Sequence, residues 1–504
     1  MSASPPPPPS LPPSSANPLA SHIASSSPPS PSFSPPSSIL IVGSGVFGLS
    51  TAWALTQRST FSQCSITVVD RADPSQPGVF PAPDAASNDS SRIIRADYAD
   101  PAYAALCAAA QVEWRKQSDP SDLGAQGRYN ESGLVLVADG VPPPPATPPT
   151  GKPEDKTKLT GMDYTRYSWA NVMSLAAQDP SLVETIRELP DASAIAGAMG
   201  TNGGGSGSWG YLNKGSGWAD AGASMAWLCD KVKKTGRVSF VPGNVVSLEH
   251  SGDTVTGARL ADGRVLSADL VMLAAGAWTG SLLDISGRAV ATGQVLGYLS
   301  ITPEEEAQLS KMPVLLNLTS GLFVIPPRNG ILKFARHAYG YINPTTVSPL
   351  PASPDAQVNN TTSLPRTSVT DPAMSIPQEG EDDLRRALAE MVRLPGLQDR
   401  PFFKTRICWY SDTPDADFII DYHPQWQNLF IATGDSGHGF KFLPVIGDKI
   451  ADCIERTCPA EFKGKWDWKQ ADSDAFVITE DGSRGGLRAL ILDEELAKSR
   501  SMPN

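Results

Sequence analysis

Between residues 38 and 69, the pattern of apolar and polar positions predicts a strand, then a helix, then a second strand. Residues 38–42 are almost wholly apolar and predict a buried strand, and Leu49 to Arg58 continue with helical spacing. A second apolar run, Ser65 to Val69, predicts another strand. This order of strand, helix and strand indicates an α/β fold class.

The turn between the first strand and the helix is rich in glycine and reads Gly43-Ser44-Gly45-Val46-Phe47-Gly48. In such a turn the first glycine allows a tight bend, the second lets the backbone approach a pyrophosphate, and the third lets helix and strand pack closely. Asp70 follows 22 residues after Gly48, where its carboxylate can accept hydrogen bonds from a ribose. The spacing predicts a Rossmann-type dinucleotide site; the alternative is a glycine-rich turn in an ordinary α/β protein.

Later strands are predicted at Gly236–Val241, Val245–Leu248 and Val255–Leu260. Another apolar strand begins at Asp269 and runs into the small residues Ala274 to Ala277. A small-residue turn after a buried strand lets the backbone approach a cofactor, although packing alone would also explain it.

Chain length and net charge limit the number of domains and the kinds of partner that we expect. The 504 residues exceed one ordinary core and predict two domains. The net charge of -12 disfavours nucleic acid and anionic membranes as partners, because both select positive charge, so we expect a small-molecule partner. Six cysteines and five histidines show no metal-ligand spacing, and we expect no metal and reduced thiols.

Several stretches are predicted to lie outside the folded core. Residues 1–37 are almost entirely Pro, Ser and Ala and are predicted to be disordered, whereas 141–158 and 345–379 are predicted to be loops. Prolines interrupt every candidate secretory signal, and no run approaches the roughly 18 apolar residues of a membrane span. The C-terminus, Ser501-Met502-Pro503-Asn504, is not an SKL-type peroxisomal address. We therefore expect a cytoplasmic protein.

Four motifs give the chain a specific resemblance. They are Ser91–Tyr98 (SRIIRADY), Leu332–His337 (LKFARH), Thr405–Tyr410 (TRICWY) and Ser436–Lys441 (SGHGFK). In order and spacing they resemble the monomeric sarcosine oxidase family, which includes N-methyltryptophan, pipecolate, fructosyl amino acid and fungal saccharopine oxidases. The pattern most resembles the saccharopine oxidase type and runs from about Ser38 to about Lys469, with Asn213–Ala221 inside it.

The resemblance implies a two-domain FAD oxidase, in which a Rossmann-type dinucleotide-binding domain interleaves with an α+β substrate domain built on an antiparallel sheet. The FAD-binding domain is expected at 38–110, 221–286 and 405–455, and the substrate domain at 111–220 and 287–404. Residues 456–504 form a C-terminal extension. We expect a monomer.

The resemblance also implies how the cofactor is held. Cys408 matches the cysteine that forms a thioether with the 8α-methyl group of FAD, giving 8α-S-cysteinyl FAD. An isolated cysteine would otherwise be interpreted as a small buried hydrophobe. The expected FAD-binding residues are Gly43, Gly45, Val46, Phe47, Gly48, Asp70, Arg71, Ser91, Arg92, Val245, Ala275, Gly276, Trp278, Cys408, Gly437, His438, Gly439, Phe440 and Lys441.

On the substrate side, the resemblance implies that Arg95 and Lys441 bind a carboxylate. It places Lys333 near flavin N5, where a fixed positive charge stabilises the superoxide that forms from oxygen. His337 and Tyr410 match substrate-side positions, and strand alternation puts Lys333 and His337 on one face. These five residues are the expected catalytic set.

One position departs from the family pattern. Phe323 stands where the family has another tyrosine, which removes a hydroxyl and puts the substrate fit there in doubt.

The cations also have plain structural interpretations. Lys333 would fit a lysine that snorkels at a strand end. Arg92 and Arg95 share a face if their segment is helical, and they would fit a solvated pair bound to Asp97 and Asp100.

Lys441 is predicted in the first turn of a helix from Phe440 to about Glu455. A cation there opposes the helix dipole. Either a bound carboxylate compensates, or the lysine is exposed and has no role.

The implied function is oxidation of a secondary amine or N-substituted amino acid such as saccharopine, pipecolate or sarcosine. A hydride equivalent leaves the carbon beside nitrogen for flavin N5, water hydrolyses the imine, and O2 becomes hydrogen peroxide.

Alternatives remain open. A fructosyl amino acid oxidase would be expected to carry Ser in place of Gly439. An N-methyl amino acid oxidase of a fungal secondary-metabolite pathway would feed its imine into a cyclisation. A flavin-binding protein without turnover would be expected to lack Lys333 or Arg95, and an NAD-dependent dehydrogenase leaves Cys408 unexplained.

Overall fold

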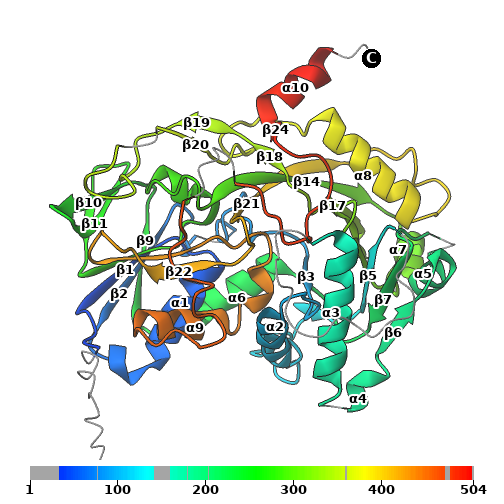
Figure 1. Cartoon of the computed structure of the whole chain (residues 1–504), viewed down its shortest axis with the longest axis horizontal. Helices are drawn as coiled ribbons and strands as arrows, with labels where there is room; N and C mark the ends of the chain where they lie inside the picture. Colours follow the sequence, from blue (N-terminus) through cyan, green and yellow to red (C-terminus); the bar gives the residue numbers. More distant parts are fainter. Residues whose placement is uncertain are drawn as a thin grey trace, which may run out of the picture. The chain divides into compact units, whose positions relative to one another are not determined.

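The computed structural model describes residues 33–76, 78–140, 159–178, 180–201, 204–357, 360–471 and 477–501. The predicted loop 141–158 and residues 1–32 of the predicted tail lie outside this part of the chain. From Pro35 onward the chain forms one compact unit, whose strands make two large sheets and three small ones (Figure 1).

The first large sheet has six strands in the order β22-β23-β13-β1-β2-β9. All neighbours are parallel except β22 and β23. Its strands are β1 (Ser38–Val42), β2 (Ser65–Asp70), β9 (Val238–Pro242), β13 (Leu270–Leu273), β22 (Ile419–Tyr422) and β23 (Leu429–Thr433). The predicted strands at 38–42 and 65–69 are therefore neighbours, as a dinucleotide-binding unit requires.

Different elements cover the two faces of this sheet. Helices α1 (Val46–Gln57), α6 (Ala221–Lys234) and α9 (Ile446–Ile454) pack together beside it (Figure 1). The three-stranded sheet of β10 (Val245–Ser251), β11 (Thr254–Leu260) and β12 (Val265–Ser267) contributes Leu248, Val255 and Leu260 to a core shared with Leu40 and Val271.

The second large sheet has ten strands and is mostly antiparallel. It contains β24 (Leu490–Ile491), β18 (Tyr341–Ile342), β14 (Val290–Ser300), β17 (Ile331–Arg336), β16 (Leu322–Arg328), β15 (Val314–Asn317), β5 (Leu134–Ala138), β7 (Trp209–Asn213), β6 (Ile186–Leu189) and β21 (Lys404–Asp412). Strand β17 turns Leu332 and Phe334 into the core beneath α8 (Gln378–Met391) and leaves Lys333 on the other face.

The remaining elements are short or lie around the sheets. They are β3 (Arg92–Ile94), β4 (Tyr129–Asn130), β8 (Gly217–Ala219), β19 (Pro344–Thr346), β20 (Thr361–Ser363), α2 (Pro101–Trp114), α3 (Gly161–Ala176), α4 (Pro180–Val183), α5 (Ala192–Met199), α7 (Pro303–Leu309), α10 (Leu492–Ser501) and the 3-10 helices η1 (Ser59–Phe61), η3 (Gly276–Ser281) and η4 (Phe440–Phe442).

Helix prediction failed after the second glycine-rich turn. The expected helix from Phe440 to Glu455 is two elements, the 3-10 turn η4 and the separate α-helix α9. Pro444 lies between them and has no N–H to donate to a preceding turn, which explains the break. Lys441 therefore does not stand in the first turn of a long α-helix.

Two other local expectations also need correction. The segment of Arg92 and Arg95 is not helical, because β3 pairs with β8 there. The predicted loop 345–379 contains the end of β19, all of β20 and the start of α8.

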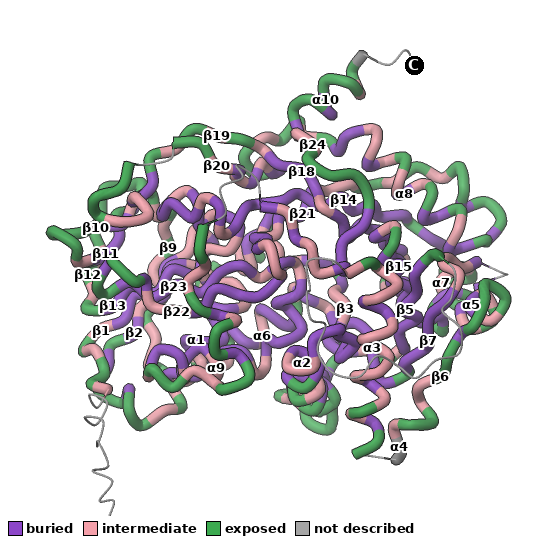
Figure 2. Tube along the Cα trace, viewed as in Figure 1, coloured by how far each residue is buried: buried purple, intermediate pink, exposed green. Residues whose placement is uncertain are grey.

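Buried residues concentrate along the strands of the two large sheets (Figure 2). Within the described residues, no helix combines the length and the apolar character that crossing a bilayer would require.

The division into FAD-binding and substrate segments stays a prediction. Strand β21, which carries Cys408, pairs along its whole length with β14 of the ten-stranded sheet.

Candidate active site

The three glycines of the first turn differ in what surrounds them. Gly43 has φ +107°, and a Cβ there would lie 2.4 Å from the carbonyl oxygen of Ala274. A Cβ on Gly48 would lie 1.9 Å from the Gly43 oxygen, so these two positions exclude larger residues by backbone contact. A Cβ on Gly45 would meet no atom within 4 Å, because this glycine faces a cavity.

That first cavity, of about 220 Å³, lies at the carboxyl end of β1. The predicted residues that line it are Gly43, Gly45, Val46, Phe47, Asp70, Arg71, Arg92, Val245, Ala275, Gly276, Trp278, Tyr410, Gly437, Gly439 and Phe440. Gly276 repeats the feature seen at Gly45, since its added Cβ would also meet nothing within 4 Å. The turn after β13 thus leaves room for a ligand close to its backbone.

Asp70 is held in place by the glycine-rich turn itself. Its Oδ2 accepts hydrogen bonds from the Ser44 backbone N–H at 2.7 Å and the Ser44 hydroxyl at 2.9 Å. Arg71, beside it, forms an ion pair with Asp84 at 2.7 Å and lies 4.1 Å from the centre of the Trp278 ring. The acidic end of β2 and the aromatic ring after β13 therefore face the same cavity.

A second cavity, of about 70 Å³, adjoins the first. Its predicted residues are Ser91, Arg92, Arg95, Phe323, Lys333, His337, Cys408, Tyr410, Gly437, His438, Phe440 and Lys441. Arg92, Tyr410, Gly437 and Phe440 line both cavities. All five residues expected to be catalytic meet here, although they come from four separate segments of the sequence.

Arg95 is a buried cation with a free donor. Arg95 is 4% exposed, and its Nη1 has no hydrogen-bond partner among the described residues. The guanidinium carbon lies 5.0 Å from the centre of the Tyr98 ring. Because a buried guanidinium nitrogen without a partner is costly, this atom calls for an acceptor inside the second cavity.

The surface-pair interpretation of the two arginines does not fit these contacts. Arg92 forms its ion pair with Asp89, not with Asp97 or Asp100. The Asp97 carboxylate accepts hydrogen bonds from Tyr211, Asn213 and Ser216 instead.

Lys441 is also buried and lacks a carboxylate partner in the described part of the chain. Its Nζ donates to the Tyr98 hydroxyl and to the His438 carbonyl, both at 2.9 Å. Burial and the nearby Arg95 charge lower the pKa of Lys441 to about 7. A bound anion would stabilise the ammonium and so oppose both effects.

Lys333 and Cys408 also line the second cavity. Lys333 Nζ donates to Asp89 Oδ2 at 2.8 Å and to the Ser91 carbonyl at 2.7 Å. Burial lowers the pKa of Lys333 to about 8, with Asp89 opposing the change. Arg92 Nη2 lies 3.2 Å from Cys408 Sγ, so this thiol meets a guanidinium at the border of the two cavities.

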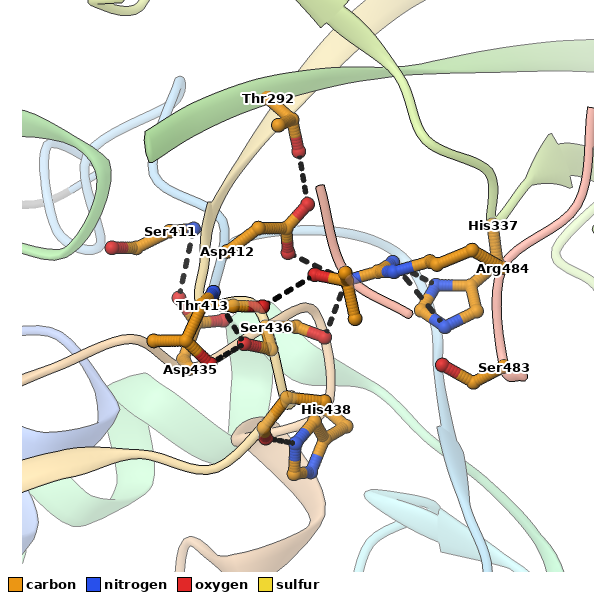
Figure 3. A network of polar contacts seen from close by, with 12 residues as sticks. Thr292, His337, Ser411, Asp412, Thr413, Asp435, Ser436, His438, Ser483 and Arg484 are labelled. Atoms are coloured by element: carbon orange, nitrogen blue, oxygen red, sulfur yellow. Dashed lines mark hydrogen bonds and ion pairs between the residues drawn. The ribbon is translucent and has the colours of Figure 1, made fainter. Parts of the chain in front are cut away.

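A residue that the sequence did not single out supports the site without lining either cavity. Arg484, from the predicted C-terminal extension, is 4% exposed and donates to Asp412 Oδ1 at 2.5 Å and to the Ser436 carbonyl at 2.8 Å (Figure 3). It also donates to His337 Nδ1 at 2.9 Å. The surrounding Gly-Ser-Arg-Gly-Gly run was the available signal, because Gly485 fits against the backbone of Thr319 to Gly321.

The buried Asp412 and the half-buried Asp435 carboxylates belong to this network (Figure 3). Asp412 accepts from the Thr292 hydroxyl at 2.6 Å, and burial raises its pKa although Arg484 opposes the change. Burial and the Asp412 charge raise the pKa of Asp435 to about 6. Within the described residues, no cluster of three His, Cys, Asp or Glu side chains could hold a metal ion.

Known proteins share this architecture over most of its length. The model of the FAD dependent oxidoreductase family matches residues 38–453. The amino acid oxidase imqH of Aspergillus flavus is 35% identical over 464 residues, which cover 83% of this chain and 92% of that protein. The L-saccharopine oxidase of Schizosaccharomyces pombe is 30% identical over 449 residues and covers 86% and 94%.

A solved structure gives the same result. The fructosyl amine:oxygen oxidoreductase Amadoriase I of Aspergillus fumigatus superposes with a TM-score of 0.70 at 28% identity, covering 91% of this chain and 96% of that one. The open positions at Gly45 and Gly276 fit a dinucleotide cofactor in the first cavity. Family match, relatives and fold agree with the α/β architecture described above: this chain belongs to the FAD dependent oxidoreductase family.

Proposed function

We propose that the protein oxidises a secondary amine or N-substituted amino acid with a single carboxylate, using FAD bonded to Cys408 and O2 as electron acceptor. The observation that carries the proposal is the free Nη1 of buried Arg95. Arg95 lines the second cavity together with Lys333 and Cys408, and this cavity adjoins the first one, where we expect the cofactor. FAD, when bound, accepts a hydride equivalent from the carbon beside nitrogen and passes two electrons to oxygen, which becomes hydrogen peroxide.

Arg95 and Lys441 would bind the substrate carboxylate together. Arg95 offers a free N–H. Lys441 lies so close to Arg95 that the repulsion between the two cations lowers the pKa of Lys441. A carboxylate between them would receive charge-assisted hydrogen bonds and remove that repulsion. This contact would fix the substrate's orientation before reaction.

The charge balance of the second cavity favours one carboxylate over several. Its other cations are already matched, since Arg92 and Lys333 share Asp89 and Arg336 pairs with Glu379. The rest of the wall is largely apolar and includes Ile93, Leu296, Leu316, Phe323 and Ile325. An apolar or aromatic side chain fits this wall better than the extra carboxylates of saccharopine do.

His337 and Tyr410 would contact the substrate from the side of the second cavity on which their two rings lie. Burial and the Arg484 charge hold the pKa of His337 well below its usual range, so the imidazole stays neutral. A neutral histidine can donate one hydrogen bond without adding charge to the cavity. The Tyr410 ring, 5.8 Å from the His337 ring centre to centre, closes the same side.

Lys333 would act on the oxygen side. Its ammonium is fixed in the second cavity by two short contacts, and a fixed cation stabilises negative charge that develops on oxygen. Arg92 would face both the cofactor and Cys408. The monomeric state and a cytoplasmic location remain predictions.

A fructosyl amino acid oxidase is the second candidate, because Amadoriase I shares the fold at 28% identity. An oxygen-consumption screen with sarcosine, pipecolate, N-methyl aromatic amino acids, saccharopine and fructosyl lysine separates the two. We expect the highest kcat/KM with an N-methyl or cyclic amino acid that carries one carboxylate and an apolar side chain. Preference for fructosyl lysine would contradict the proposal, as would oxygen uptake with none of these compounds.

A further inference from the structure

Asp89 is a buried carboxylate that lines neither cavity but contacts two residues that do. Its side chain is 2% exposed. The carboxylate accepts hydrogen bonds from Lys333 Nζ at 2.8 Å, from the Arg92 guanidinium, from the Tyr298 hydroxyl at 2.8 Å and from the Ser90 N–H at 2.7 Å. One anion therefore holds two cations that come from different strands, β3 and β17.

The contacts of Asp89 with Lys333 and Arg92 matter because of where these two cations lie. Lys333 lines the second cavity, and Arg92 lines both cavities and touches Cys408. Lys333 has only two hydrogen-bond acceptors among the described residues, Asp89 and the Ser91 carbonyl. Without Asp89 the ammonium would keep a single neutral acceptor in a buried site.

The charges around Lys333 show what Asp89 contributes. Burial and the Arg92 charge both disfavour the ammonium, whereas Asp89 favours it, and the resulting pKa of Lys333 is about 8. Burial would raise the pKa of Asp89, but its cationic neighbours hold it well below the usual range, so the carboxylate stays charged. The groups that face this ion pair are Arg92, Tyr298, Arg406 and Cys408.

We propose that Asp89 is a positioning residue for the oxygen reaction: it anchors the Lys333 ammonium in the second cavity and keeps it protonated at neutral pH. The inference rests on the proposed function, because it assumes that Lys333 faces oxygen beside the bound cofactor. Asp89 acts through Lys333 and does not itself touch either cavity.

The test compares Asp89→Asn with the wild-type holoenzyme and with Glu305→Gln as matched control. Glu305 is a carboxylate in another ion pair, with Arg400 at 2.7 Å, and lies on neither cavity. Holoenzyme reduced with dithionite is mixed with oxygenated buffer between about pH 6 and pH 9, so no substrate need be known. A second readout is the visible absorbance of the oxidised holoenzyme titrated over the same range.

We expect wild type and Glu305→Gln to reoxidise fast below about pH 8 and to slow above it, because the ammonium is lost there. Asp89→Asn should reoxidise at least about tenfold more slowly at neutral pH and recover as the pH falls, because each unit of pKa changes the charged fraction up to tenfold. The absorbance change should move to lower pH in the same variant. Lys333→Met should slow reoxidation at every pH, and adding Asp89→Asn to it should change little.

A wild-type rate and pH profile in Asp89→Asn would overturn the inference and leave the proposed oxidase intact. If Asp89→Asn does not fold, Asp89→Glu decides. It keeps the charge but displaces the ammonium, so slower reoxidation with the pH midpoint retained is expected, and an unchanged rate overturns the inference. A wild-type protein that carries flavin but is not reoxidised by O2 contradicts the proposed function instead.

Discussion

Arg484 Nη1 lies 2.9 Å from His337 Nδ1, and the same guanidinium pairs with Asp412. A guanidinium can only donate. Nδ1 is the nearer imidazole nitrogen and Nε2 lies 3.3 Å from the same Nη1, so we assign the acceptor to Nδ1 and the His337 proton to Nε2. The C-terminal segment thereby sets the tautomer of a residue in the second cavity. This contact joins positions 147 residues apart in the sequence.

Breaking the Arg484–Asp412 pair should cost stability. Arg484→Met leaves Asp412 buried without its cation, and we expect a loss of about 3–5 kcal/mol in the free energy of unfolding. The double variant Arg484→Met, Asp412→Asn should be more stable than the sum of the single losses predicts, because neither charge remains unpaired. Urea unfolding of all four proteins measures the coupling, and strictly additive losses would contradict the pairing.

Gly45 and Gly48 should respond differently to alanine. Gly45→Ala should fold with a near wild-type melting temperature and bind little FAD, because its Cβ enters the first cavity. Gly48→Ala should itself be destabilised, by about 1–3 kcal/mol or more, because its Cβ meets the Gly43 carbonyl oxygen. Thermal melts of the FAD-free proteins and flavin content after reconstitution distinguish them; equal melting losses would refute the assignment of Gly45 to the cofactor.

Much of the six-stranded sheet was predictable because its signals are local. The strands at 38–42 and 65–69 were confirmed, since apolar runs between turn residues report directly on burial. The helix expected from Phe440 onward failed although Pro444 was visible in the sequence, so the error was one of weighting.

The contacts of the buried residues Asp89 and Arg484 could not be predicted from the sequence, for a different reason. Asp89 contacts Lys333, 244 positions away, and Arg484 contacts Asp412, 72 positions away, and no local pattern encodes such a distance. The roles expected for Arg95, Lys333 and Cys408 came from motifs, and these roles stay predictions. The structure brings the three residues to one cavity.

Lys333→Met should separate the two halves of the catalytic cycle. We expect reoxidation by oxygen to slow far more than anaerobic reduction by substrate, because the proposed role of the Lys333 ammonium is to stabilise charge on oxygen, whereas the proposed carboxylate ligands are Arg95 and Lys441. Stopped-flow absorbance measures both steps. Equal slowing of the two would remove Lys333 from the oxygen reaction.

Arg95→Ala should raise KM for amino acid substrates roughly 10- to 100-fold, the value of one or two charge-assisted hydrogen bonds. Arg264→Ala is the matched control, since Arg264 pairs with Asp262 on an exposed turn. An unchanged KM in Arg95→Ala would exclude this residue from the carboxylate site.

Carboxylate binding should also depend on pH. Burial and Arg95 lower the pKa of Lys441 to about 7, so its charge is present below that pH and lost above it. The affinity for amine-free carboxylates, followed by flavin absorbance, should therefore fall as the pH rises through about 7. A constant affinity from about pH 6 to pH 9 would show that Lys441 is not a ligand.

The most direct test of the whole account is the fate of the flavin when the purified yellow protein is denatured in acid and digested. We predict that the colour stays with the polypeptide and that mass spectrometry finds one FAD on the peptide containing Cys408, whereas Cys408→Ala releases its flavin. Free flavin from the wild-type protein, or flavin attached at another residue, would contradict the central claim.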